Sequence, residues 1–319
     1  MFRRTDDEDD DTFDPIFSGQ ERGFWAQDEW DEFPCRIIDP SIINVNDTWY
    51  SFSTNSGGRN IQIATSDDFD TWTLLQTDAL PDLPAWISDQ PTDVWAPDVS
   101  LLDNGYFIMY YTARTDEDSR YHCVGAATSQ SIEGPFEPCS DDPLICDLSV
   151  GGAIDPAGYE EDGQRYILWK VDGNALPYGS GPCGPTNHTT PLYIQPVAAD
   201  GVTLQGSKSQ LVDNQGSSDD GIVEAPSLTK CGSTYVLFFS SGCFTTTNYK
   251  VNYATSTSLT GGFQRAQNAL FQTGTQNLTA PGGASIDRDA KHLVFHANYN
   301  GGRALWTDIV TIDGDQVSA

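Results

Sequence analysis

Residues 106–112 read Tyr-Phe-Ile-Met-Tyr-Tyr-Thr (YFIMYYT), a run of seven residues that contains four aromatic and two aliphatic side chains. This length and composition are typical of a strand buried in a β-sheet. The turn sequence LDNG (102–105) precedes the run, WAPDVSLL (95–102) lies before that turn, and CVGAATS (123–129) follows. The stretch therefore predicts the second strand of an antiparallel unit, with one strand on each side of it.

The same unit occurs five times. The other central runs are TWYSFST ending at Thr54, RYILWKV ending at Val171, TYVLFFS ending at Ser240 and HLVFHA ending at Ala297. The five end points are 58, 59, 69 and 57 residues apart, and a turn rich in Asn, Asp or Gly precedes each run. A weaker fourth strand is expected at WTLLQ, FEPCS, VTLQG and FQRA. The pattern predicts an all-β five-bladed β-propeller with four antiparallel strands per blade. A β-sandwich would explain the alternation but not the period.

The one long interval contains an insertion at 172–191, rich in Gly and Pro, which indicates a surface loop that helps to shape a binding site. The first 30 residues lie outside the five units and form an acidic tail and lead-in segment, in which Phe24, Trp25 and Trp30 are candidate anchors. Residues 31–319 are expected to be one propeller domain.

Charge and cysteine content limit the partners. Sixteen basic and 46 acidic residues give a net charge of -30, which repels nucleic acid and anionic membranes and favours a neutral ligand. No apolar run reaches the roughly 18 residues of a membrane helix. Seven cysteines and the sequons at Asn46, Asn187 and Asn277 predict a secreted, extracellular glycoprotein with disulfides, and the odd count leaves one thiol over. We expect a monomer.

Acidic residues stand at the start of most units, where the first strand of a propeller blade reaches the central axis. The segments are IIDPSII with Asp39, WAPDVSLL with Asp98, GGAIDPAGY with Asp155, GIVEAPSL with Glu224, and APGGASI with no acid. A lone Asp-Pro is more often a turn carboxylate. Three acids from three blades would repel one another in a shared funnel, and glycoside hydrolysis needs such a set: one protonated acid and one ionised base.

The set of Asp39 in IIDPS, Asp155 in AIDPA and Glu224 in VEAPS resembles glycoside hydrolase family 43, over about residues 33 to 310. The resemblance implies that Asp39 is the general base, Glu224 the general acid and Asp155 the third carboxylate, which raises the pKa of the acid and orients it. It also implies inversion of the anomeric configuration. The expected substrate is neutral plant cell-wall polysaccharide, with α-L-arabinofuranosyl linkages in arabinan or arabinoxylan favoured over β-xylosides.

Three further residues are candidates for binding the substrate. Trp95 is a candidate platform for a sugar ring, and Asp98 of the WAPD turn is given a supporting role. Arg303 corresponds to an arginine that the family places against hydroxyls of the terminal sugar. Many members carry a histidine at the start of the fifth blade beside an axial calcium or sodium ion. Here Gly282 and Gly283 stand in that region, which counts against a bound ion; no cofactor is required, and His296 is expected to be a core residue.

Two alternatives remain open at this point: a β-xylosidase of the same fold, and a non-catalytic sugar-binding propeller. The related families 32 and 68 are disfavoured because their motifs contain RDP and EC where this sequence has IDP and EAP. Exo or endo action is also left open.

Overall fold

The computed structural model describes residues 37–319, except residue 90 and residues 177–182 and 185–187. The expectations for residues 1–30, and for Phe24, Trp25 and Trp30 as anchors, therefore lie outside the described residues. Strands dominate this part of the chain, and its helical elements are four short 3-10 turns: η1 (Leu148–Val150), η2 (Gly173–Ala175), η3 (Gly216–Asp219) and η4 (Thr275–Asn277). No helix in the described ranges has the length and apolar character needed to cross a membrane.

Five antiparallel sheets follow one another along the chain, each built by hairpins between consecutive strands. The first is β1 (Ser41–Val45), β2 (Thr48–Ser53), β3 (Gln62–Ser66) and β4 (Thr73–Leu74). The second is β5 (Trp95–Leu101), β6 (Phe107–Arg114), β7 (His122–Ser129) and β8 (Glu137–Pro138). The third is β9 (Ala153–Glu161), β10 (Gln164–Val171), β11 (Leu192–Val197) and β12 (Ser209–Val212).

The fourth sheet is β13 (Val223–Cys231), β14 (Thr234–Ser241), β15 (Lys250–Ser256) and β16 (Gln264–Arg265). The fifth has three strands among the described residues, β17 (Gly282–Ile286), β18 (His292–Tyr299) and β19 (Gly302–Ile309), and the chain ends with the hairpin of β20 (Thr311–Asp313) and β21 (Gln316–Ser318). The predicted all-β five-bladed propeller is confirmed.

The five apolar runs identified in the sequence are the second strands β2, β6, β10, β14 and β18. Three of the four expected fourth strands coincide with β4, β8 and β16. The expectation for VTLQG (202–206) is wrong: this segment forms only an isolated bridge between Leu204 and Val197, and β12 follows it at Ser209–Val212. The carboxylate of Asp200 explains the difference, because it accepts the N–H groups of Val202 and Thr203 and holds a turn there.

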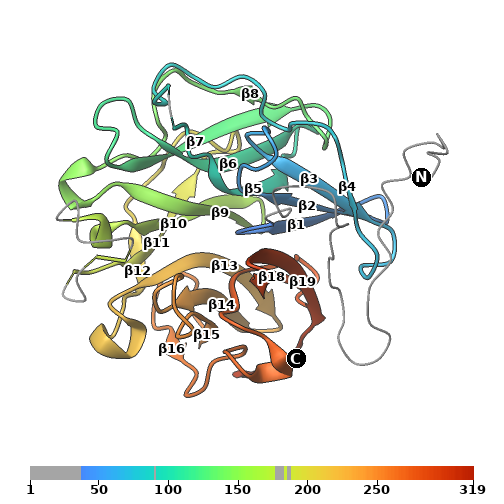
Figure 1. Ribbon diagram of the computed structural model, residues 1–319, viewed down its shortest axis with the longest axis vertical. Coiled ribbons are helices and arrows are strands. Elements are labelled where there is room, and N and C mark those ends of the chain that lie inside the picture. The colour runs from blue at the N-terminus through green and yellow to red at the C-terminus, as the bar shows by residue number, and fades with distance from the viewer. Residues whose placement is uncertain (1–36, 90, 177–182, 185–187) are drawn as a thin grey trace, which may run out of the picture.

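A ring is closed by packing between neighbouring blades. The inner strands β1, β5, β9, β13 and β17 contact one another in cyclic order, and β1 also contacts β17 and β18 of the last blade. In Figure 1 the blue first blade lies beside the dark red fifth blade. One buried apolar cluster joins the fifth blade to the first through Ile42, Trp49, Val294 and Leu305. Each fully buried apolar side chain contributes about 1.5–3 kcal/mol to the stability of the fold. This cluster therefore contributes substantially to holding the last blade against the first.

A repeated backbone feature marks the entry of each blade at the axis. Five residues at equivalent positions have φ between 45° and 60°: Asp39, Ala96, Asp155, Ala225 and Gly283. In blades two to five the pairing between first and second strands shifts register at this residue, which is therefore a β-bulge. A bulge re-aims the neighbouring side chains. Here it directs the residue before the bulge and the bulge residue itself toward the axis.

Four cysteines form disulfides, Cys123–Cys146 and Cys183–Cys243. Cys139 and Cys231 are exposed thiols, and Cys35 lies outside the described residues. Disulfides are thus confirmed, with at least two thiols left over rather than the one expected. The second disulfide ties the insertion in the third blade to the loop between β14 and β15.

Candidate active site

One cavity of about 620 Å³ opens at the end of the propeller where the five bulges lie. Five of the six residues proposed from the sequence line it: Asp39, Trp95, Asp155, Glu224 and Arg303. They come from all five blades between them, so the cavity exists only in the closed ring. Beneath its floor a narrow axial channel runs between the five bulge segments and includes Asp39 and Asp155.

A ring of five hydrogen bonds holds the floor together. Each bulge residue donates its backbone N–H to the preceding blade. Four of the acceptors occupy one equivalent position, on the second strand or, for Thr54, directly after it, and the fifth is a carboxylate. The bonds are Ala96 to Thr54 Oγ1 (3.2 Å), Asp155 to Thr112 Oγ1 (3.0 Å), Ala225 to Asp155 Oδ2 (2.9 Å), Gly283 to Ser240 Oγ (2.8 Å) and Asp39 to His296 Nδ1 (3.0 Å). Each bond fixes the backbone that carries one wall of the cavity.

The third blade departs from this pattern. Lys170 occupies the position held elsewhere by Thr54, Thr112, Ser240 and His296, and it pairs with Ile154 as Ser240 pairs with Glu224. An ammonium group has no lone pair and cannot accept a hydrogen bond. The carboxylate of Asp155 takes over as the acceptor for the N–H of Ala225. Asp155 is thereby bonded to the residue that directly follows Glu224.

Glu224 has a donor on each carboxylate oxygen. The hydroxyl of Tyr249 donates to Oε1 at 2.7 Å, and the ammonium of Lys170 donates to Oε2 at 3.0 Å. Lys170 also pairs with Asp172 Oδ1 at 3.1 Å and is 1% exposed. Burial raises the pKa of Tyr249 well above its usual value, so it remains a donor. The carboxylate is therefore held in one orientation, partly exposed to the cavity.

Asp39 and Asp155 both have raised pKa values, with burial the largest cause. For Asp39 the pKa is about 6, because burial and the charge of Glu224 raise it while the guanidinium of Arg303 and the hydroxyl of Thr54 lower it. For Asp155 burial comes first and the charges of Glu224 and Asp39 follow, and together they raise its pKa well above the usual value. Asp39 is thus ionised near neutral pH.

One wall of the cavity carries an aromatic ring and unpaired polar atoms. Trp95 is half-buried and stacks on His122 at 4.0 Å between ring centroids, and both residues line the cavity. Asn174 also lines the cavity; it is buried, and its Oδ1 has no hydrogen-bond partner among the described residues.

The opposite rim is made by Phe244 and Arg303. The guanidinium lies 5.0 Å from the Phe244 ring centroid and donates to the Phe244 carbonyl at 2.8 Å. Phe244 directly follows Cys243, which is joined to Cys183 of the third-blade insertion. The disulfide therefore anchors the segment against which Arg303 is positioned.

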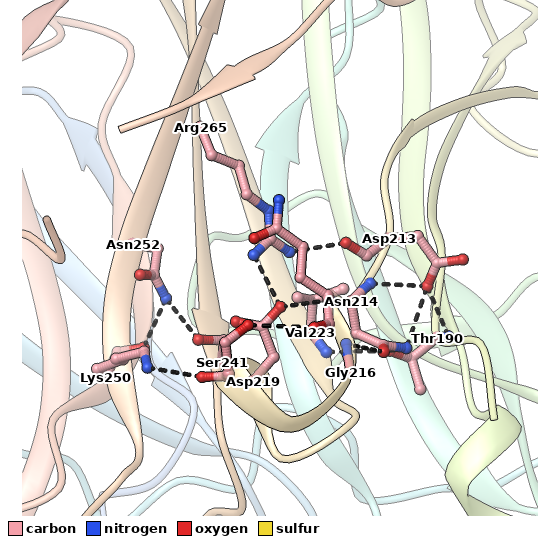
Figure 2. Close-up of polar contacts among 12 residues, drawn as sticks. Thr190, Asp213, Asn214, Gly216, Asp219, Val223, Ser241, Lys250, Asn252 and Arg265 are labelled. Atoms are coloured by element: carbon pink, nitrogen blue, oxygen red, sulfur yellow. Dashed lines mark hydrogen bonds and ion pairs between the residues drawn. The ribbon is translucent and has the colours of Figure 1, made fainter. Parts of the chain in front are cut away.

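The loop that leads into Glu224 is braced by a polar network (Figure 2). Thr190 Oγ1 accepts the N–H of Val223, the residue before Glu224, at 3.0 Å. Arg265 donates to Asp219 Oδ2 at 2.8 Å and to the Asp213 carbonyl at 2.7 Å, which ties both ends of the loop between β12 and β13 to β16. The network gives Glu224 a rigid support.

Asp98 does not line the cavity. It stands two residues after the bulge, faces the axial channel and a pocket at the far end of the propeller, and accepts the N–H of Gly158 at 2.7 Å. Burial raises its pKa to about 7, partly offset by that N–H and by Arg288. The placement is that of a residue that supports the second and third blades. Glu224 also differs from the simple repeat pattern, since it stands one residue before the bulge position held by Asp39 and Asp155.

The family resemblance raises a calcium or sodium ion at the axis, where Gly283 and His296 lie next to each other. Within the described ranges no three His, Cys, Asp or Glu side chains are grouped as metal ligands. Gly283 offers no ligand, and a Cβ there would lie 2.7 Å from the His296 ring. His296 accepts the N–H of Asp39 on Nδ1, while its Nε2 is buried without a hydrogen-bond partner among the described residues. Likewise a Cβ on Gly282 would lie 1.9 Å from the Tyr249 ring. Steric crowding therefore explains why glycine occupies both positions.

Residues of this site that were not found from the sequence include Lys170, Tyr249, Asp172 and Asn174. Lys170 had a visible signal, because a lysine inside the apolar run RYILWKV needs an acidic partner when buried. The other three stand in loops after second strands, where the sequence carries no periodic pattern. His296 was expected in the core and is indeed fully buried, but it also touches Asp39.

Comparison with known proteins places the chain among carbohydrate-active enzymes. The model of Glycosyl hydrolases family 43 matches residues 33–316. A relative named probable arabinan endo-1,5-alpha-L-arabinosidase A, from Neosartorya fischeri, is 26% identical over 295 residues, which cover 86% of this chain and 79% of the relative. An extracellular endo-alpha-(1->5)-L-arabinanase from Thermotoga petrophila is 31% identical over 158 residues, or 45% of this chain, and the match spans about a third (31%) of that longer protein.

Solved structures agree with the fold. A thermostable family-43 glycoside hydrolase superimposes with a TM-score of 0.75 at 21% identity, covering 88% of this chain and 92% of that chain. The family match confirms the resemblance seen in the acidic motifs, and with it the expectation of a glycoside hydrolase. The chain belongs to glycosyl hydrolases family 43.

Proposed function

We propose that the protein hydrolyses α-L-arabinofuranosyl linkages in α-1,5-linked arabinan, with inversion at the anomeric carbon. The observation that carries this proposal is the arrangement of Asp39 and Glu224, which come from blades one and four and line a single cavity that can hold sugar rings. Supporting it, the two curated relatives described above are both named as arabinan-cleaving enzymes.

Glu224 is the proposed general acid. It transfers its proton to the glycosidic oxygen as the bond between that oxygen and the anomeric carbon breaks, so the leaving sugar departs as an alcohol. Asp155, bonded to the N–H of Ala225, is the proposed orienting carboxylate. Tyr249 and Lys170 hold the two oxygens of Glu224.

Asp39 is the proposed general base. With a pKa of about 6 it is ionised near neutral pH and takes one proton from a water molecule, whose oxygen attacks the anomeric carbon from the face opposite the leaving group. One water is consumed, one C–O bond forms and one breaks. The reaction inverts the configuration and restores the enzyme once protons return from Asp39 to solvent and from solvent to Glu224.

The walls of the cavity fit a neutral furanoside. The indole ring of Trp95 suits the C–H groups of a sugar ring. Arg303 supplies donors on the opposite rim. Asp98, outside the cavity, is proposed as a scaffold residue rather than a direct contact. The net charge of -30 disfavours acidic polysaccharides by repulsion.

The proposal extends to an extracellular, monomeric glycoprotein. Its support is two disulfides, relatives named extracellular, and the exposed positions of Asn46 and Asn277 in sequons. Asn187 lies outside the described residues. Mass spectrometry of the protein secreted by a eukaryotic host, before and after enzymatic deglycosylation, tests this part; a single unmodified mass would contradict it.

The activity is tested by product release from linear arabinan, arabinoxylan, an aryl α-L-arabinofuranoside and an aryl β-xyloside. We expect the highest kcat/KM on linear arabinan. Preference for the aryl β-xyloside would favour a xylosidase instead, and binding without hydrolysis on all four substrates would identify a sugar-binding propeller.

A further inference from the structure

Lys170 is the one position of the axial ring at which a cation replaces a hydrogen-bond acceptor. The equivalent side chains Thr54, Thr112, Ser240 and His296 each accept the N–H of a bulge residue, and in the third blade that task falls to Asp155. A hydroxyl at position 170 would satisfy the ring equally well. Lys170 therefore needs an explanation other than closing the propeller.

The partners of Lys170 supply one. Its ammonium is 1% exposed and lies 3.0 Å from Glu224 Oε2 and 3.1 Å from Asp172 Oδ1. A buried ammonium is costly unless its partners are close, and these two carboxylates share it. Burial lowers the pKa of Lys170, but the charges of Glu224, Asp172 and Asp155 outweigh it and hold the pKa above its usual value, so the group keeps its charge.

We propose that Lys170 and Asp172 act together as a positioning pair that sets how firmly Glu224 holds its catalytic proton. Lys170 stabilises the carboxylate that Glu224 becomes when it gives up the proton, and Asp172 neutralises enough of the ammonium charge for Glu224 to be reprotonated. The inference rests on the proposed role of Glu224 as the general acid.

The other groups around Glu224 are the same in the wild-type protein and in variants at Lys170 or Asp172. The Tyr249 hydroxyl faces it from the segment before β15, Asp155 from β9, Asp39 from the entry of β1 and Arg303 from β19. Changing Lys170 or Asp172 leaves these groups in place. The two substitutions alter the charge next to Glu224 in opposite directions, which makes the pair separable from a purely structural role.

The variants are Lys170→Met and Asp172→Asn, each close in size to the native residue. In D172N the full charge of Lys170 acts on Glu224, so its proton is lost at lower pH and the alkaline limb of the kcat/KM profile on linear arabinan moves down by about one pH unit. In K170M the limb moves up by a similar amount, and kcat falls by about tenfold or more because the new carboxylate lacks its counter-ion.

Lys230→Met is the matched control, since Lys230 pairs with Glu161 at the far end of the propeller. It should leave the profile unchanged. An aryl α-L-arabinofuranoside with a good leaving group, which departs without a proton, should show a much smaller loss of kcat in K170M than arabinan does.

Thermal unfolding of each variant shows whether it is folded. If K170M is not folded, the direction in which the alkaline limb of D172N moves is the test of the inference. Limbs that stay in place in D172N, or that move in the same direction in both variants, would overturn the inference while leaving the proposed function intact. A wild-type protein without activity on arabinan or on the aryl arabinofuranoside would instead overturn the proposed function.

Discussion

His296 Nδ1 accepts the backbone N–H of Asp39 at 3.0 Å, across 257 positions of sequence. The bond joins the last blade to the first and at the same time holds the residue proposed as the catalytic base. It requires that Nδ1 carry no proton. Burial and the nearby Arg303 lower the pKa of His296 well below its usual value, which keeps the imidazole neutral.

Replacing His296 by Ala should destabilise the protein by about 1–3 kcal/mol, because the N–H of Asp39 is left without an acceptor. Ser240→Ala removes the equivalent bond between blades five and four and should cost a similar amount. The free energy of unfolding in urea measures both. Equal stabilities of wild type and H296A would show that the bond does not close the ring.

The two variants should differ in pH dependence. Below about pH 6.5 the unfolded chain binds a proton on His296 that the folded chain does not, so this residue removes stability as pH falls through that value. Asp39 and Asp155, whose pKa values are raised, act in the opposite sense and are common to all three proteins. The difference between wild type and H296A should therefore shrink at acid pH, while the difference between wild type and S240A should stay constant. If the difference in unfolding free energy from wild type stays constant with pH for both variants, His296 is not held neutral by the fold.

The ionisation of Asp39 should set the acid limb of activity. A base must be ionised, and with a pKa of about 6 the value of kcat/KM should fall as pH decreases below about 6. Arg303→Gln removes a charge that lowers this pKa, so the limb should move to higher pH in that variant, together with a higher KM. Lys230→Gln, far from the cavity, serves as control. If the acid limb lies at the same pH in R303Q and in wild type, the ionisation of Asp39 does not set that limb.

Much of this arrangement could be predicted from the sequence because it is periodic. The five aromatic runs alternate with turns at a nearly constant interval, and that pattern alone predicts five hairpin units. Asp39, Asp155 and Glu224 could be placed at the axis because each begins a unit. The β-bulges could not be predicted, and for that reason the one-residue offset of Glu224 and the two-residue offset of Asp98 were missed.

The contacts of the site depend on tertiary structure. Tyr249 reaches Glu224 because Gly282 leaves room for its ring, and Asn174 lies in an insertion without periodicity. Lys170 was within reach of sequence reasoning, since a lysine at the end of an apolar strand is unusual. Its partners Glu224 and Asp172 could be identified only once the blades were assembled.

Removing the disulfide between Cys183 and Cys243 should raise KM more than it lowers kcat. Cys243 positions Phe244, whose carbonyl and ring hold Arg303 at the rim, whereas Asp39 and Glu224 are fixed by other bonds. The paired variant Cys183→Ser with Cys243→Ser is the sample, and Cys139→Ser, a free exposed thiol, is the control. A loss confined to kcat would argue against the rim as a binding element.

The central claim is that Glu224 donates the proton to the leaving sugar and Asp39 activates water, and leaving-group dependence tests it most directly. The measurement is kcat/KM for Glu224→Gln and Asp39→Asn on linear arabinan and on an aryl α-L-arabinofuranoside whose leaving group needs no protonation. The account predicts that E224Q loses about 10²–10⁴ on arabinan and much less on the aryl substrate, while D39N loses a comparable factor on both. Equal losses of E224Q on the two substrates, or full activity of either variant on arabinan, would contradict it.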